Sequence, residues 1–305
     1  MSRINSLVGV AIAVAGFMIP LTAFSQAHNA ANHSHPNVAV DCTNLATPPW
    51  DGLPEKDRLQ MAALQQESMS AYNTPEAAKA AGFMPFESSA IPGMGVHYVS
   101  AARMQDPIDI NAPDHLMFAS IDGQDQLVGA AFVFIDLIDA DKPILFDNEL
   151  AKWHDHPGIG QEGRTLHMLH IWFVPSSNGP FAGLNFWLGY QYAGVAVPSS
   201  CWMAEAADAE RIQTVSFALV PPREGAQEQA PRSERTEMIA ALDAAARAVD
   251  HDAWVAAADR FIADLSETER NTVSALLGVL NTAQMSSAER DAAGIAQPGR
   301  GRDRN

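Results

Sequence analysis

The middle section of the chain consists of short runs of β-branched and aromatic residues separated by turn-forming residues. Asp122 and Gly123 between two of the runs are typical of a two-residue hairpin turn, and connections this short join antiparallel neighbours. The segment therefore predicts an antiparallel sheet, either open or curled into a small barrel. Its strands are expected at Gly95–Ala101, His115–Ile121, Leu127–Asp136, Leu166–Val174 and Asn185–Val195.

Helices are predicted on both sides of this segment. Before it, Pro54–Tyr72 repeats apolar residues near helical spacing, and a second helix runs from the N-cap Thr74 to Ala81, where Gly82 ends it. After Pro221 and Pro222 the chain becomes rich in alanine and charged residues, which favours helices. This order of elements predicts an α+β fold with a C-terminal helical appendage.

The appendage, residues 222–293, contains several helix-start signals. N-caps are expected at Ser233 and at Asp250 or Asp252, and capping boxes at Ser266 with Glu269 and at Ser286 with Glu289. An apolar stripe at helical spacing predicts a packing face rather than a cofactor site, and it comprises Trp254, Ala257, Phe261, Ile262 and Leu265.

The N-terminus has the features of an export signal. Arg3 precedes an apolar run, and small residues allow cleavage after Ala27, so residues 1–27 are expected to be a signal peptide. The mature protein would then be periplasmic or secreted with no stable membrane insertion; a retained anchor is the alternative. We divide the mature chain into a flexible lead-in with histidines (28–40), an α+β core domain (41–221), the appendage and a disordered tail (294–305).

Charge and cysteine content narrow the range of partners. The formal net charge is -17, and removal of Arg3 with the leader brings it to -18, which disfavours nucleic acid and anionic membrane surfaces as partners. Cys42 and Cys201 both follow the cleavage point, and an exported protein meets an oxidising compartment. We therefore expect one disulfide between them, with two buried free thiols as the alternative.

Histidines are concentrated in one part of the chain. His154, His156, His167 and His170 fall within seventeen positions, although the whole chain has only ten histidines in 305 residues. Imidazole is a good ligand for Zn, Cu, Fe and Ni, so the grouping predicts a Cu or Zn site. His97 is a further candidate ligand, because it follows a glycine turn on a predicted strand. Hydrogen-bonded structural histidines without a metal are the alternative, and His115 and His251 are expected to be structural.

Strand alternation decides which of these histidines can share a site. His167 and His170 are three residues apart, so they face opposite sides of a strand. We favour His170 as the ligand and expect Trp153, Met168 and Trp172 to line its pocket. His167 is expected either to orient a ligand from behind or to serve as an alternate ligand.

The chemistry beyond metal binding stays open, and whether the protein is an enzyme or a metal carrier is not decided by these residues. Glu149 is the candidate general base, since it lies five residues before His154. One alternative is a metal-free periplasmic module that binds a small molecule or sugar. Another is a copper monooxygenase that uses His28 as the mature N-terminus, with sugars stacked on aromatic residues; these would be Trp172, Trp187, Tyr190 and Tyr192.

The chain resembles a family of uncharacterised, mostly secreted bacterial proteins. The resemblance extends from about Thr74 to Asn185 and rests on a Gly-Met-Gly-x-His-Tyr strand at 93–98, a Trp-His-x-His loop at 153–156, and Leu-Val-Gly at 127–129. It implies a compact β-rich domain that gathers His97, His154 and His156, and it implies no established activity. A glutamate often follows the Leu-Val-Gly start in this family, whereas Ala131 stands here.

Overall fold

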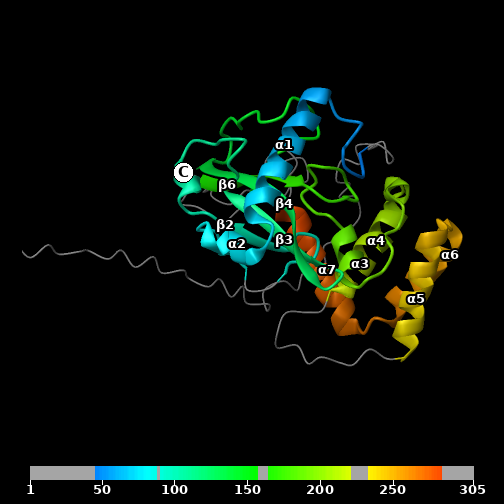
Figure 1. The fold of residues 1–305 in the computed structure, drawn as a ribbon. Coiled ribbons are helices and arrows are strands. Elements are labelled where there is room, and N and C mark those ends of the chain that lie inside the picture. Colours follow the sequence, from blue (N-terminus) through cyan, green and yellow to red (C-terminus); the bar gives the residue numbers. More distant parts are fainter. Residues whose placement is uncertain (1–44, 88–89, 157–163, 221–232, 284–305) are drawn as a thin grey trace, which may run out of the picture. The chain divides into compact units, whose positions relative to one another are not determined.

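The computed structural model describes residues 45–87, 90–156, 164–220 and 233–283 (Figure 1). The predicted signal peptide, the lead-in with His28, Cys42, the capping box at Ser286 and the C-terminal tail lie outside the described residues, and these expectations remain predictions. Within the described ranges, the chain has no helix with the length and apolar character needed to span a membrane.

The two predicted N-terminal helices are confirmed. Helix α1 spans Glu55–Tyr72 and helix α2 spans Pro75–Ala80. The Thr74 side chain caps α2 by accepting a hydrogen bond from the Ala77 amide at 3.2 Å. Gly82 follows the helix with φ +90°, a left-handed conformation that glycine adopts without a steric cost.

The predicted antiparallel sheet is also confirmed, and it is an open sheet rather than a barrel. Its order is β1-β2-β3-β4-β6-β5, with β1 and β5 as the two edges. Asp122 and Gly123, both with positive φ, form the hairpin turn between β3 and β4. The strands are β1 (Met84–Pro85), β2 (Val96–Val99), β3 (His115–Ile121), β4 (Gln124–Leu137), β5 (His154–His156) and β6 (Arg164–Trp172).

The strand predicted at Asn185–Val195 is wrong, because this segment forms helix α3 (Trp187–Tyr192). The Asn185 side chain accepts a hydrogen bond from the Trp187 amide at 3.1 Å and so supports the first helical turn. The segment is buried over most of its length, so it lacks the polar positions that would reveal a helical period. Helix α4 (Ala206–Leu219) and the short 3₁₀ helices η1 (Arg103–Gln105) and η2 (Ser200–Ala204) were not predicted.

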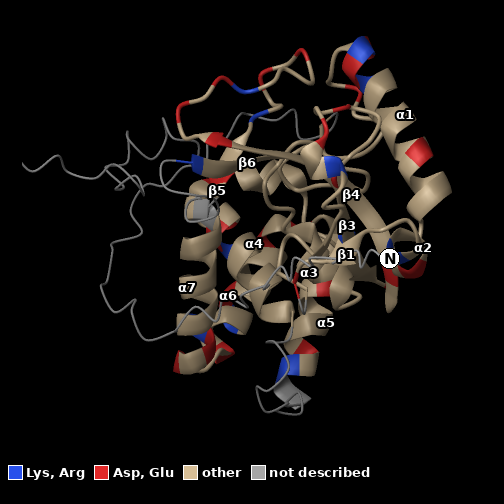
Figure 2. Cartoon of the chain, turned by 90° about the vertical axis from the view of Figure 1, so that its left-hand side faces the viewer, with Lys and Arg blue, Asp and Glu red and all other residues tan. Residues whose placement is uncertain are grey.

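Helices lie on both sides of the sheet. Figures 1 and 2 show α1 across one side of the strands and α7 (Glu267–Ala283) on the other. On the α1 side, Leu116, Phe132, Leu169 and Ile171 join α1 residues in one buried hydrophobic cluster. The sheet is therefore covered on both faces, and side chains on the α7 side are shielded from water as well.

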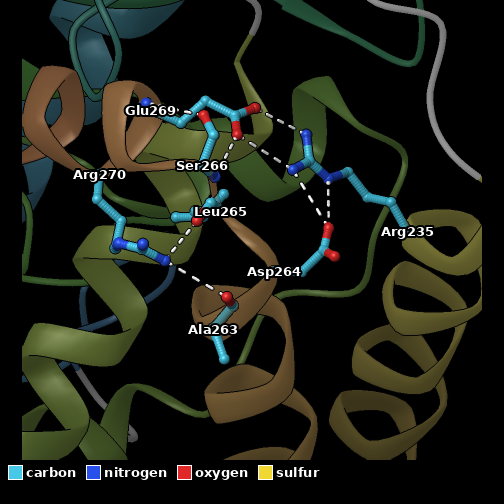
Figure 3. Close-up of polar contacts among 7 residues, drawn as sticks. All are labelled: Arg235, Ala263, Asp264, Leu265, Ser266, Glu269 and Arg270. Atoms are coloured by element: carbon cyan, nitrogen blue, oxygen red, sulfur yellow. Dashed lines mark hydrogen bonds and ion pairs between the residues drawn. The ribbon is translucent and has the colours of Figure 1, made fainter.

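The C-terminal helices α5 (Ser233–Ala248), α6 (His251–Asp264) and α7 form as predicted. Asp250 caps α6, and Ser266 and Glu269 form the expected reciprocal capping box at α7 (Figure 3). The stripe residues pack into a second hydrophobic cluster together with α3 and α4. Residues on both sides of the predicted boundary at 221–222 thus contribute to this cluster.

Candidate metal centre

The register of the sheet directs five histidines to one face. His115 is opposite Ala131 on β4, and Ala131 is in turn opposite His170 on β6. His97 pairs with Met117, two residues along β3 from His115. At the β5 edge of the sheet, His154 pairs with Met168, two residues from His170, and His156 lies two residues beyond His154. Because paired residues in a sheet project to the same side, all five side chains share a face.

The five imidazoles form a continuous row of neighbouring rings, which we call the histidine cluster: His97, His115, His154, His156 and His170. Ring centroids are 6.1 Å apart between His115 and His97, and 5.5 Å apart between His97 and His170. His154 lies 4.9 Å from both His170 and His156. All but His156, which is half-buried, are buried. The structure thus gathers the four histidines expected at the site and adds His115, which we expected to be structural.

Small residues stand on the central strand β4, between the strands that carry the histidines. His97 and His170 lie on strands separated by β3 and β4, yet their ring centroids are 5.5 Å apart. A Cβ on Gly129 would lie 2.4 Å from Cε of Met117 and 2.6 Å from the Ile171 carbonyl oxygen, so no side chain fits there. Ala131 lies in register between His115 and His170.

Glu87 holds His97 in place through two contacts. Its Oε2 accepts the His97 backbone amide at 2.6 Å, and its Oε1 lies 3.0 Å from Nδ1 of the same residue. Burial raises the pKa of Glu87, but its hydrogen bonds and charge attraction with His97 outweigh burial and hold this pKa below its ordinary value. Because Nδ1 contacts Glu87, the ring presents Nε2, which is buried and has no hydrogen-bond partner among the residues that the structure describes.

Asp114 orients His115 in the same way, through a contact with Nδ1 of the ring. Its Oδ1 lies 2.5 Å from Nδ1 of His115, while its Oδ2 accepts the Val133 amide at 3.1 Å. Burial lowers the pKa of His115, and the hydrogen bond to Asp114 offsets this only in part. His115 is therefore oriented by a carboxylate that is itself anchored to the central strand.

His170 lies at the middle of the cluster and has a different set of neighbours. Its Nδ1 is 2.8 Å from the Gly183 carbonyl oxygen, and its Nε2 is 2.9 Å from Sδ of Met168. Burial, followed by repulsion from His97 and His156, holds the pKa of His170 well below its usual value. A neutral imidazole is the form that binds metals.

His167 lies on the opposite face of β6, as the alternation of strand side chains requires. Its Nδ1 lies 2.6 Å from Oδ1 of Asp155, and its Nε2 lies 3.0 Å from the Leu137 carbonyl oxygen. The ring stacks on Phe134 with centroids 4.6 Å apart. Both ring nitrogens thus face oxygen acceptors away from the histidine cluster, so the described contacts support a structural role.

The three residues expected to line the pocket separate into two groups. Met168 contacts His170, and the Trp172 ring lies 6.1 Å from it, so both border the histidine cluster. Trp153 instead packs edge-on against Phe134, on the His167 side, and its Nε1 donates to the Pro143 carbonyl at 2.9 Å. Trp153 therefore belongs to the packing of the opposite face.

The carboxylates that contact the cluster are not the one selected from the sequence. Glu149 is exposed, and the contacts described for the histidine cluster involve Glu87 and Asp114 instead. Asp114 could have been found from its position next to His115. Glu87 is brought to His97 by the pairing of β1 with β2, and a two-residue strand leaves no periodic signal.

The aromatic residues considered for sugar stacking are mostly inside the fold. Trp172, Trp187 and Tyr190 are buried, and only Tyr192 is exposed. A cavity beside Trp172 has a volume of about 90 Å³, whereas small-molecule pockets typically have roughly 300–1,000 Å³. These residues therefore offer little contact area to a sugar ring.

The described part of the chain contains no group of three or more histidine, cysteine, aspartate or glutamate side chains already arranged to hold a metal ion. The rings of the histidine cluster are neighbours, so a shared ion requires side-chain rotation or a donor of another type. No protein-family model, curated protein or solved structure matches the chain.

Proposed function

We propose that this protein is an exported metal-binding protein that holds a transition-metal ion, Cu or Zn, at the histidine cluster. The observation that carries the proposal is the state of His97. Its Nδ1 is held by the half-buried carboxylate of Glu87, and its Nε2 is buried without a hydrogen-bond partner in the described part of the chain. An unsatisfied buried polar nitrogen costs about 1–3 kcal/mol, and a bound ion would remove that cost.

Two neighbouring histidines support the same interpretation. Histidines that bind metals usually donate their other ring N–H to a carboxylate or a carbonyl oxygen, which fixes the ring and raises its basicity. His97, His115 and His170 each have Nδ1 beside such a group, namely Glu87, Asp114 and the Gly183 carbonyl. Each of these rings is thus oriented so that Nε2 serves as the donor atom.

The export part of the proposal rests on the leader sequence, with its single basic residue, apolar run and small residues before the cleavage point. A periplasmic or secreted location is consistent with the expected Cys42–Cys201 disulfide. A mature protein outside the cytoplasm takes its ion from the surroundings, and imidazole is a good ligand for both copper and zinc.

The test is metal content after dialysis of the mature protein against copper or zinc. The lead-in histidines are first replaced (His28→Ala, His33→Ala, His35→Ala), so that these three side chains do not contribute to the measured metal content. In this background we expect about one ion per chain, which His97→Ala abolishes. His251→Ala is the matched control, because this histidine contacts Asp208 on a different surface.

Two results would overturn the proposal. One is a metal content below roughly 0.2 ion per chain for both metals, because a specific site fills to near stoichiometry. The other is a bound ion that His97→Ala and His251→Ala affect equally, since that would place it outside the histidine cluster. Circular dichroism of each variant checks that the fold is retained.

A further inference from the structure

The contact between His170 and Met168 points to the kind of ion that the cluster takes. A neutral imidazole has one N–H, but both ring nitrogens of His170 face acceptors: the Gly183 carbonyl oxygen at 2.8 Å and the Met168 thioether at 2.9 Å. Either tautomer therefore leaves one pair of acceptors facing each other. Full burial of the ring beside other histidines disfavours the doubly protonated form that would satisfy both.

A soft cation bound by Nε2 of His170 and Sδ of Met168 resolves this conflict. With Nδ1–H donating to Gly183, the Nε2 lone pair and the sulfur lone pairs are directed at one another. Thioether sulfur is a soft ligand and selects cuprous copper, whereas zinc in proteins is bound by thiolate, imidazole and carboxylate.

Further thioethers lie on the same side of the sheet. Met117 is the register partner of His97 and is fully buried. Met104 packs against the small apolar cluster that contains Met168, Ala131 and Val133. Met168 thus contacts the histidine cluster directly, Met117 is paired in register with His97, and Met104 packs against the small apolar cluster that contains Met168; all three have neutral, polarisable side chains.

The charge of the site also favours a monovalent ion. The carboxylates that contact the cluster, Glu87 and Asp114, lie behind His97 and His115 and are engaged with their Nδ1 atoms. The donor atoms that remain are neutral imidazole nitrogens and a thioether. Burying a doubly charged ion among neutral donors costs more than burying a singly charged one, because desolvation rises steeply with charge.

From these contacts we infer that the histidine cluster is a cuprous-copper site in which Met168 Sδ completes the ligand set with Nε2 of His170 and Nε2 of His97. This inference rests on the proposed function and names the ion. The exported protein would bind copper in its reduced state and discriminate against zinc. The sulfur atom of Met168 is the element of the site that provides this discrimination.

The test compares two methionine variants of the mature protein in the background without lead-in histidines. Met168→Leu removes the sulfur and conserves volume, and Met61→Leu makes the same change at a buried position on α1, outside the cluster. Cuprous affinity is measured without oxygen, with ascorbate as reductant and bicinchoninate as the competing chelator. Zinc affinity is measured in parallel with a zinc-responsive dye.

We expect Met168→Leu to weaken cuprous binding by about tenfold or more and to leave zinc binding unchanged, with Met61→Leu like the parent in both assays. X-ray absorption of the copper-loaded parent should show a sulfur neighbour that Met168→Leu lacks. Parent-like cuprous affinity in Met168→Leu, or tighter binding of zinc than of cuprous copper by the parent, would overturn the inference and leave metal binding intact. Failure to bind either metal would instead refute the proposed function.

Discussion

The capping box of α7 allows a quantitative prediction about stability. Glu269 accepts the Ser266 amide at 2.8 Å and pairs with Arg235 of α5 at 2.8 Å, and Arg235 also reaches Asp264 of α6 (Figure 3). The hydrogen bond from Arg235, followed by those from Ser266, lowers the pKa of Glu269 from 4.5 to about 2. The change Glu269→Gln keeps the shape of the side chain and removes its charge.

The magnitude follows from this pKa. A reduction from 4.5 to about 2 corresponds to an upper limit of about 3 kcal/mol at neutral pH. The Glu269 side chain is 42% exposed, so solvent screening reduces the expected loss on Glu269→Gln to about 1 kcal/mol. Because the pKa is lower in the folded state, the stabilisation is complete above the unfolded-state pKa near 4.5 and is lost as pH falls toward 2.

Urea denaturation followed by far-ultraviolet circular dichroism measures the effect at pH values from neutral to strongly acidic. The gap in unfolding free energy between parent and Glu269→Gln should be constant near neutral pH and should shrink below the unfolded-state pKa. Glu267→Gln is the control, because Glu267 is exposed in the same first turn and meets the same helix dipole. A gap that does not vary with pH, or equal losses in both variants, would refute this account of the ion pair.

Two further predictions concern the packing beneath the cluster and the cysteines. Gly129→Ala should destabilise the fold by about 1–3 kcal/mol in urea denaturation, because the new Cβ would overlap Met117 and the Ile171 carbonyl. Gly278→Ala on α7 is the control and should not destabilise the fold, because a Cβ there meets open space. Equal denaturation midpoints for the two variants would contradict this prediction. For the Cys42–Cys201 disulfide, the intact mass of non-reduced protein should be lower by two hydrogen atoms, and Cys201→Ser should cost about 2–4 kcal/mol. Titratable thiols in unfolded, non-reduced protein would exclude the disulfide.

Local signals in the sequence were sufficient for much of the fold. The cap at Thr74, the turn at Asp122 and Gly123, and the capping box at Ser266 each depend on residues within a few positions of one another, and each is confirmed. The prediction for segment 185–195 was wrong because residues 185–190 are all buried, which erases the periodicity on which the distinction between strand and helix depends.

The candidate site was accessible from the sequence only in part. Strand alternation correctly separated His170 from His167, because side-chain direction along a strand is a local property. The sequence does not identify Glu87 as a partner of His97, and it predicts His115 to be a structural histidine. Both positions depend on which strands pair and in what register. Strand pairing and register involve residues far apart in the chain and follow from the burial of whole strand faces.

Local patterns in the chain thus predict the helices with clear caps, most strands, and the histidines of separate segments as candidate ligands. That a ring from β2 lies 5.5 Å from a ring of β6, with two strands between them, follows from the strand order and register of the folded sheet. The tertiary structure also decided that a thioether lies against Nε2 of His170. The physical reason is that caps and turns are short-range interactions, whereas the partners of a buried side chain are set by long-range packing of the entire sheet.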